Sequence, residues 1–237
     1  VGLLLLTLAV FSVFSMKAPK GSDAMSGMAN AAIASFLVEA VHKYILGDVL
    51  ALEFEDGTIV KTINGHGFFD VEENQKNGFM SAIFTIEGPA GFNFDPARLE
   101  ELYQMGFRIT SLGWNEKNIL TGSNVTGGGL TDMGREYIKE AQRLGMIIDV
   151  SHISDEAFWD IMDITQAPII ATHSNSRSIC GESRNLTDDM FRQICKTGGV
   201  AGFNQYASFI GRPATMECAC RHFLRFMELD PDGKHIA

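Results

Sequence analysis

Three side chains that can bind a metal ion each follow a short apolar run of the sequence. Glu87 directly follows residues 81–86, His152 follows residues 146–150 after one serine, and His173 directly follows residues 169–172. Imidazole nitrogens and carboxylate oxygens are the usual non-sulfur ligands of zinc, and a carboxylate can also bridge two metal ions. We therefore interpret Glu87, His152 and His173 as candidate metal ligands, whereas a single Glu or His at such a place is commonly structural.

The apolar runs alternate with segments of helical periodicity from residue 80 onward. The pattern predicts strands at 81–86, 108–112, 146–150, 169–172 and 199–203, and helices at 96–105, 131–144, 154–165 and 187–196. The last three helices open with Thr131, Ser154 and Thr187, which are good N-cap residues and are followed by acidic residues. Strands alternating with helices of this length predict parallel β-α units, in either a barrel or a doubly wound sheet.

The strand ends matter because the active sites of β/α barrels lie at the carboxyl ends of the strands. Three metal-binding side chains at three such ends form a pattern that core packing does not explain. The glycine run 127–129 is interpreted as a flexible turn and not as a nucleotide-binding loop, because no Lys-Ser/Thr follows it.

Composition limits the classes of function. The 237 residues are 46% hydrophobic and 20% charged, which is typical of one large globular α/β domain. The net charge of -10 comes from scattered residues, so no nucleic-acid partner is expected. The four cysteines form no C-x-x-C pair, and we expect them to be reduced.

The N-terminal segment, residues 1–76, is poorly specified apart from a helix predicted at 36–46, and residues 77–237 carry the β-α pattern. Residues 1–15 are apolar but shorter than the roughly 20 residues that span a bilayer, so no stable membrane span is expected. A signal-peptide remnant, a buried strand and a start in mid-frame all fit this run, and Val1 in place of Met favours a fragment. A cytoplasmic location is favoured over a secreted or membrane-anchored one.

Six motifs occur in a fixed order between residues 77 and 206. They are TIEG at 85–88, LYQMGFR at 102–108, GLTDMGRE at 129–136, RLGMIIDVSH at 143–152, ATHSNSR at 171–177 and SRNLTDD at 183–189. This ordered set resembles the membrane (renal) dipeptidase family of zinc metallopeptidases. The resemblance implies an α/β fold, a TIM-type (β/α) barrel of the metal-dependent hydrolase kind, with two zinc ions as cofactor.

The resemblance also implies residue roles. In the family, the Glu of the E-G motif bridges two zinc ions and the histidines of the D-x-x-H and H-S motifs bind the second ion, which points to Glu87, His152 and His173. The Arg of the R-N motif contacts the substrate carboxylate, which points to Arg184, and a guanidinium suits a carboxylate geometrically. Tyr206 aligns with a tyrosine on the substrate side.

Two departures from the family pattern affect the expected activity. The family begins with a strand that ends in H-x-D and completes the first zinc site, but no H-x-D occurs here, and residues 66–70 have the wrong spacing. The family's acid/base Asp lies in a later G-G-D-x-D-G motif, which the chain does not reach before Ala237. We therefore assign no catalytic residue and expect a barrel that is incomplete at both ends, inactive or poorly folded by itself.

The function that follows is zinc-dependent hydrolysis of dipeptides, with a dipeptide as partner and a homodimer as one oligomeric state. Two alternatives stay open. One is a related barrel amidohydrolase that acts on a cyclic amide or lactone, and the other is a catalytically inactive structural or metal-binding relic. Trp114 is expected to pack on the barrel rim, because burial is the common use of aromatic side chains.

Overall fold

The computed structural model describes residues 49–55, 58–65 and 80–237. These residues fall into two compact units, which are described separately. One unit contains residues 86–100 and 109–237, and the other contains the described residues up to 85 together with 101–108. The predicted helix at 36–46 lies outside the described residues, and the predicted division near residue 76 stays a prediction.

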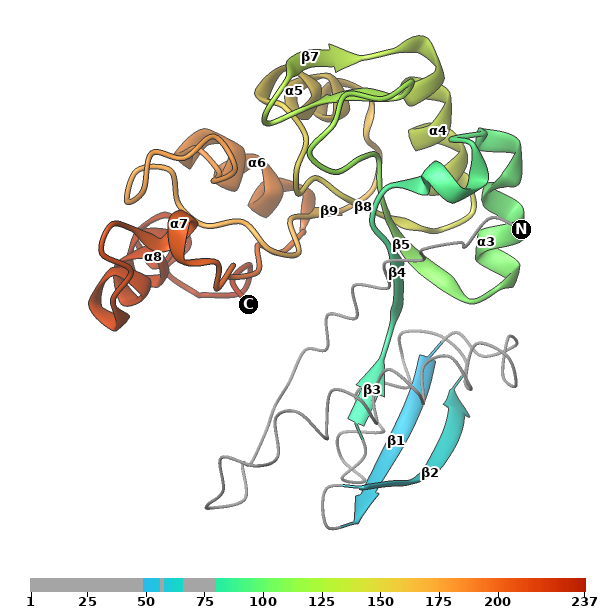
Figure 1. The fold of residues 1–237 in the computed structure, drawn as a ribbon, viewed down its shortest axis with the longest axis horizontal. Helices are drawn as coiled ribbons and strands as arrows, with labels where there is room; N and C mark the ends of the chain where they lie inside the picture. Colours follow the sequence, from blue (N-terminus) through green and yellow to red (C-terminus); the bar gives the residue numbers. More distant parts are fainter. Residues whose placement is uncertain (1–48, 56–57, 66–79) are drawn as a thin grey trace. The chain divides into compact units, whose positions relative to one another are not determined.

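A parallel sheet carries the predicted β-α units (Figure 1). Its strand order is β4 (Phe84–Ile86), β5 (Phe107–Ser111), β8 (Ile147–Asp149), β9 (Ile169–Ile170). β5 pairs with β8 and β8 pairs with β9, both in parallel, with Ile109 opposite Ile147 and Ile148 opposite Ile169. Parallel bridges from Ala171 to Ala201 and from Ala201 to Ile236 continue the same direction of pairing. The strand predicted at 199–203 is therefore reduced to the bridge at Ala201.

Three predicted helices follow the strands at the expected places. They are α4 (Asp132–Arg143), α5 (Asp155–Ile164) and α6 (Asp188–Thr197). The side-chain oxygens of Thr131, Ser154 and Thr187 accept a hydrogen bond from the backbone N–H three residues on, so each predicted N-cap is confirmed. The predicted helix at 96–105 is a 3-10 turn η2 (Pro96–Arg98) followed by α3 (Leu99–Gln104).

Apolar faces of the helices form the core of the larger unit. α4 packs against β8 and α5, and α6 packs against β9 and α8 (Met216–Leu229). Phe191 of α6 stacks on Phe226 of α8 with ring centroids 4.1 Å apart. The buried Tyr137 hydroxyl hydrogen-bonds Thr110 Oγ1 of β5 at 2.7 Å, which ties α4 to the sheet at a position that water cannot reach.

The glycine run is part of a hairpin, so its interpretation as a flexible turn was wrong. β6 (Thr121–Ser123) pairs antiparallel with β7 (Gly127–Leu130). A Cβ at Gly122 would lie 2.0 Å from the carbonyl oxygen of Gly127, so the two strands can approach only without side chains. α5 holds the hairpin, because Ser154 Oγ donates to the Gly128 carbonyl at 2.5 Å and Asp160 Oδ2 accepts from the Leu130 N–H at 2.8 Å.

The other unit contains an antiparallel sheet with the order β2-β1-β3. Its strands are β1 (Val49–Glu55), β2 (Thr58–Gly65) and β3 (Met80–Ala82). The strand predicted at 81–86 is thus divided, since Ser81 pairs with Ala51 of β1 while β4 belongs to the parallel sheet. Among the described residues, no helix is long and apolar enough to cross a membrane.

Candidate metal centre

Glu87, His152 and His173 meet beyond the carboxyl ends of three strands of the parallel sheet. Glu87 is the first residue after β4, His152 is the third after β8, and His173 is the third after β9. Glu87 Oε1 lies 2.9 Å from His152 Nε2 and 3.3 Å from His173 Nε2, and the two Nε2 atoms are 2.9 Å apart. The three residues predicted from separate strand ends therefore offer their ligand atoms to a single point.

Two unusual backbone positions aim these side chains. Gly88, directly after Glu87, has a φ of 77°, and its N–H donates to Ser111 Oγ at 3.0 Å. His152 has a φ of 72°, a conformation that costs a non-glycine residue free energy and is concentrated at functional sites. The chain turns sharply at both positions, so that a carboxylate and an imidazole point at each other.

Contacts at the other ring nitrogens indicate which nitrogen carries the proton in each histidine. His152 Nδ1 lies 3.0 Å from Asn115 Oδ1, which can only accept, so Nδ1 donates. His173 Nδ1 lies 2.7 Å from Thr172 Oγ1, whose own proton goes to Asp149 Oδ2 at 2.6 Å, so this Nδ1 also donates. Both Nε2 atoms then present a lone pair to the cluster. A second hydrogen bond that orients the ring in this way is usual for histidines that ligate metals.

The charge states that burial favours also suit metal ligands. Burial lowers the pKa of His152, so the imidazole is neutral at neutral pH. Burial by itself would raise the pKa of Glu87, but the close contacts with His152 and His173 outweigh it and hold the pKa well below its usual range. A carboxylate and a neutral imidazole are the forms that bind a cation.

The cluster is chemically complete only with a positive charge at its centre. Glu87 Oε1 is buried and lacks a hydrogen-bond donor among the described residues, and the two lone pairs on the Nε2 atoms face it. Such a set repels itself unless a proton or a metal ion lies between its members, and burial disfavours the proton on His152. The residues present therefore fit a divalent metal with nitrogen and oxygen ligands.

Arg184 lies in the same pocket as His152, between β9 and α6. Its Nη1 donates to Ser174 Oγ at 2.6 Å, whereas the buried Nε and Nη2 atoms have no hydrogen-bond partner within the described part of the chain. Burial lowers the pKa of Arg184 to about 10, although the negative charges of Asp149 and Glu87 oppose this effect. The guanidinium thus stays charged at neutral pH and has two donors to offer to an anion.

Tyr206 and Trp114 are placed differently from the cluster. Tyr206 is 62% exposed at the start of α7 (Ala207–Ile210), and its ring contacts Phe209. Trp114 is 55% exposed, with its ring centroid 5.9 Å from that of His152. The side chain of Trp114 therefore lies beside a candidate ligand and is half open to solvent.

Three residues around the ligands were not selected from the sequence. Asn115 orients His152, while Thr172 and Asp149 orient His173. Thr172 directly precedes His173, and Asp149 lies three residues before His152, so both belong to the strand-end motifs. The sequence carried a signal for Asp149 and Thr172, because short polar side chains next to buried apolar runs are uncommon without a hydrogen-bond partner.

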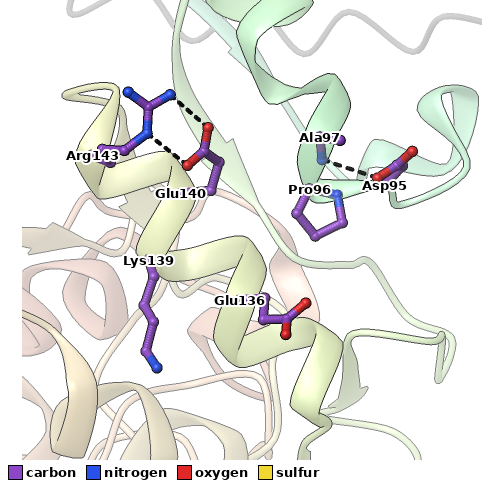
Figure 2. A pocket seen from close by; sticks show the side chains of 7 residues that line it. All are labelled: Asp95, Pro96, Ala97, Glu136, Lys139, Glu140 and Arg143. Carbon is purple, nitrogen blue, oxygen red and sulfur yellow. Dashed lines mark hydrogen bonds and ion pairs between the residues drawn. The ribbon is translucent and has the colours of Figure 1, made fainter.

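A larger groove of about 510 Å³ lies elsewhere, between residues 95–97 and α4 (Figure 2). Two of its charges form an ion pair, Arg143 with Glu140 at 2.7 Å, and Arg143 also lies 3.4 Å from Glu100. The groove contains none of the clustered metal ligands found in the described residues. It is a charged surface depression.

Parallel β-α units with a Glu and two His beyond the strand ends are the arrangement of a metal-binding β/α barrel. The model of the membrane dipeptidase family, peptidase family M19, matches residues 65–229. The chain belongs to this family.

Relatives and solved structures agree with that assignment. An uncharacterized protein in the pqqA 5′ region of Klebsiella pneumoniae is 37% identical over 149 residues, covering 60% of this chain and 55% of that protein. An uncharacterized dipeptidase of Schizosaccharomyces pombe is 33% identical over 165 residues, covering 65% of this chain and 40% of that protein. The chain thus spans about half the length of these relatives.

The crystal structure of a metallopeptidase from Rhodobacter sphaeroides, liganded with a phosphinate mimic of the dipeptide L-Ala-D-Ala, has a TM-score of 0.66 and 28% identity. The match covers 71% of this chain and 52% of that one. An amidohydrolase from Pseudomonas aeruginosa, at 22% identity and a TM-score of 0.65, covers 71% of this chain and 53% of that one and shows the same fold. The predicted TIM-type barrel class is confirmed, and this chain contains part of such a barrel.

Proposed function

We propose that this chain carries the metal centre and the carboxylate-binding arginine of a zinc-dependent dipeptidase. The observation that supports the proposal is the convergence of Glu87 Oε1, His152 Nε2 and His173 Nε2, whose ligand atoms lie within 4.8 Å of one another. The donor set of one carboxylate and two imidazoles is a usual one for zinc. Zinc bound there would polarise a peptide carbonyl and lower the pKa of a water molecule toward neutrality.

The remaining steps depend on side chains of this chain. Glu87 keeps its negative charge because its pKa is low, and it balances part of the charge of a cation. Arg184 offers Nε and Nη2 to the free carboxylate of a dipeptide, and the buried position strengthens that charge-assisted contact. Binding the carboxylate at Arg184 would hold the peptide bond near His152, because Arg184 and His152 line one pocket.

The zinc content of the purified chain tests the metal part of this proposal. Elemental analysis should find about one zinc per folded chain, as expected for a single cluster of protein ligands. His152→Ala and His173→Ala should each lose it. His235→Ala is the matched control, because its Nδ1 donates to the Gly199 carbonyl outside the cluster, and this variant should keep its zinc. Folded wild-type protein without zinc after reconstitution would refute the metal centre.

Hydrolysis of a dipeptide, compared with that of a lactone, tests the substrate part. A version of this chain extended to the full length of its relatives and reconstituted with zinc should release amino acids from a dipeptide with a free carboxylate. It should leave a neutral lactone intact, because a lactone has no carboxylate for Arg184. Preference for the lactone would instead favour the cyclic-substrate amidohydrolase, and a zinc-loaded protein that hydrolyses neither would favour the structural relic.

A further inference from the structure

Asp149 is a buried acid that the proposed function does not use. It lies at the end of β8, and its two carboxylate oxygens are engaged differently. Oδ1 accepts from the backbone N–H groups of Ser151 at 2.9 Å and Thr172 at 3.0 Å. Oδ2 accepts from the Thr172 hydroxyl at 2.6 Å. The carboxylate thereby connects the strand ends that carry His152 and His173.

The direction of these hydrogen bonds affects which nitrogen of His173, a member of the metal cluster, carries the proton. Asp149 Oδ2 accepts the hydrogen bond of the Thr172 hydroxyl, so the single proton of Thr172 Oγ1 points toward Asp149. The lone pairs of Oγ1 then face His173 Nδ1, 2.7 Å away, and require the proton of the imidazole to be on Nδ1. The alternative hydroxyl partner, Ser151 Oγ, is 3.5 Å from Oγ1 and is a much weaker contact.

From this arrangement we infer that Asp149 is a positioning residue that acts through Thr172 to hold His173 in the Nδ1–H tautomer, so that the lone pair of Nε2 faces the metal cluster. The inference rests on the metal centre of the proposed function. It makes Asp149 and Thr172 determinants of metal affinity although neither contributes an atom to the cluster. Second hydrogen bonds of this kind typically account for a 10- to 100-fold change in metal affinity.

Asp149→Asn should reverse the direction of the hydrogen bonds that run from residue 149 through Thr172 to His173, which we call the relay. In this variant the side-chain oxygen of the new Asn must accept from the N–H groups of Ser151 and Thr172, as Asp149 Oδ1 does in the wild type. The NH₂ group of the Asn side chain must therefore face Thr172 Oγ1. The hydroxyl then accepts from the amide and donates its proton to His173 Nδ1. The proton of the imidazole moves to Nε2, the atom that must bind the metal.

The direct test is the tautomer of His173 in metal-free protein, read from ¹⁵N chemical shifts of histidine-labelled samples under mildly alkaline conditions. The chain has six histidines, and a His173→Gln spectrum identifies the signal. The wild type should show Nδ1–H, Asp149→Asn should show Nε2–H, and Thr172→Ser should keep the wild-type tautomer because it retains the hydroxyl. An Nε2–H tautomer in the wild type, or an unchanged tautomer in folded Asp149→Asn, would overturn the inference.

Zinc titration supplies the second measurement. Asp149→Asn and Thr172→Val should bind zinc about 10- to 100-fold more weakly, and Thr172→Ser should bind it as the wild type does. Asp160→Asn is the matched control: its carboxylate also accepts a backbone N–H, but of Leu130, and it pairs with Arg135 outside the cluster. Equal weakening in this control would assign the effect to general destabilisation and would contradict the relay.

The two proposals can fail separately. Wild-type protein that binds no zinc but shows the Nδ1–H tautomer would refute the metal centre and leave the hydrogen-bond relay in place. Zinc binding that is unaffected by Asp149→Asn would leave the metal centre in place and refute the relay.

Discussion

Two buried guanidinium nitrogens of Arg184, Nε and Nη2, lack a hydrogen-bond partner in the described part of the chain. Leaving such donors unsatisfied costs about 1–3 kcal/mol each, so an arrangement of this kind is expected where a ligand supplies the acceptors. Ser174 Oγ holds the third nitrogen, Nη1, and thereby orients the group. At the scale of single residues, Arg184 is therefore the strongest indication of an anionic substrate group.

Replacing Arg184 by Met should remove selectivity for a free carboxylate. In the version extended to the full length of its relatives, the catalytic efficiency toward a dipeptide should fall roughly 10- to 100-fold, because hydrogen bonds to charged groups contribute about 1.5–3 kcal/mol. Hydrolysis of the corresponding dipeptide amide should change little, since the amide has no negative charge. Arg135→Met, which removes a surface partner of Asp160, is the control and should leave both rates as they are. An equal loss on both substrates in Arg184→Met would contradict the assignment.

His222 of α8 has a structural role. Its Nδ1 accepts from the Ser176 N–H at 3.1 Å, and its Nε2 donates to the Ile210 carbonyl at 2.9 Å. Burial lowers the pKa of His222, and the neighbouring Arg221 lowers it further, although the two backbone contacts oppose this. The folded state thus favours the neutral ring.

The pH dependence of stability should reflect this preference. Above a pH of about 6.5, the ordinary pKa of histidine, the ring is neutral in both states and its contribution is complete. As the pH falls below that value the unfolded chain takes up a proton more readily than the folded chain, so the free energy of unfolding decreases. Urea titrations across this range should show a smaller decrease in His222→Gln than in the wild type. His152 contributes in the same direction, so some decrease should remain.

At the scale of elements, helix N-caps connect local sequence to the positions of the strand ends. Thr187 Oγ1 caps α6 by accepting from the Met190 N–H at 3.2 Å. Ser154 Oγ caps α5 by accepting from the Ala157 N–H and also donates to the Gly128 carbonyl of β7. The N-cap of α6 therefore stabilises its helix alone, whereas the N-cap of α5 stabilises its helix and also holds the hairpin.

Alanine substitution at these two caps should separate the tasks. Thr187→Ala should lower the free energy of unfolding by about 1 kcal/mol, the usual value for a lost N-cap. Ser154→Ala should lower it by about 2 kcal/mol, because a further net hydrogen bond of about 1 kcal/mol to the hairpin is lost. Hydrogen exchange should speed up at residues 127–130 in Ser154→Ala only. Equal costs for the two variants would mean that the contact to Gly128 does not stabilise the hairpin.

At the scale of the whole molecule, close packing between sheet segments controls the cluster. A Cβ at Gly202 would lie 2.1 Å from the carbonyl oxygen of Thr172, the residue that contacts His173. The segment after β9 and the segment around Ala201 can be neighbours only because this position has no side chain. The geometry at His173 thus depends on a residue 29 positions further along the chain.

Gly202→Ala should disturb folding and metal binding together. Forcing a methyl group into this contact should lower the free energy of unfolding by about 1–3 kcal/mol and shift Thr172 away from His173. Chemical denaturation and zinc titration measure the two effects. Gly181→Ala is the control, because its Cβ would meet no atom within 4 Å, and both properties should stay as in the wild type. Unchanged zinc affinity in a destabilised Gly202→Ala would show that the cluster tolerates movement of Thr172.

The sequence by itself determined the β-α order, the three helix caps and the three candidate ligands. These features are local: hydrophobic periodicity sets the elements, Thr131, Ser154 and Thr187 mark helix starts, and the residue after a parallel strand must lie at its carboxyl end. The hairpin β1–β2 was missed, although Asp56-Gly57 between two β-rich runs is a hairpin signal. The strand at 199–203 was predicted too long, because its pairing depends on partners distant in the sequence.

Only the tertiary structure decided which atoms meet. The bonds from Asp149 to Thr172 join residues 23 positions apart. The φ of 72° at His152, and the buried Arg184 nitrogens that lack a hydrogen-bond partner among the described residues, are seen only in the folded chain. An aspartate at the end of a buried strand indicates that it has a hydrogen-bond partner, but the sequence does not identify that partner. Hydrogen-bond direction depends on distances of a few tenths of an ångström, and those are set by the packing of the sheet and its helices and not by the spacing of residues along the chain.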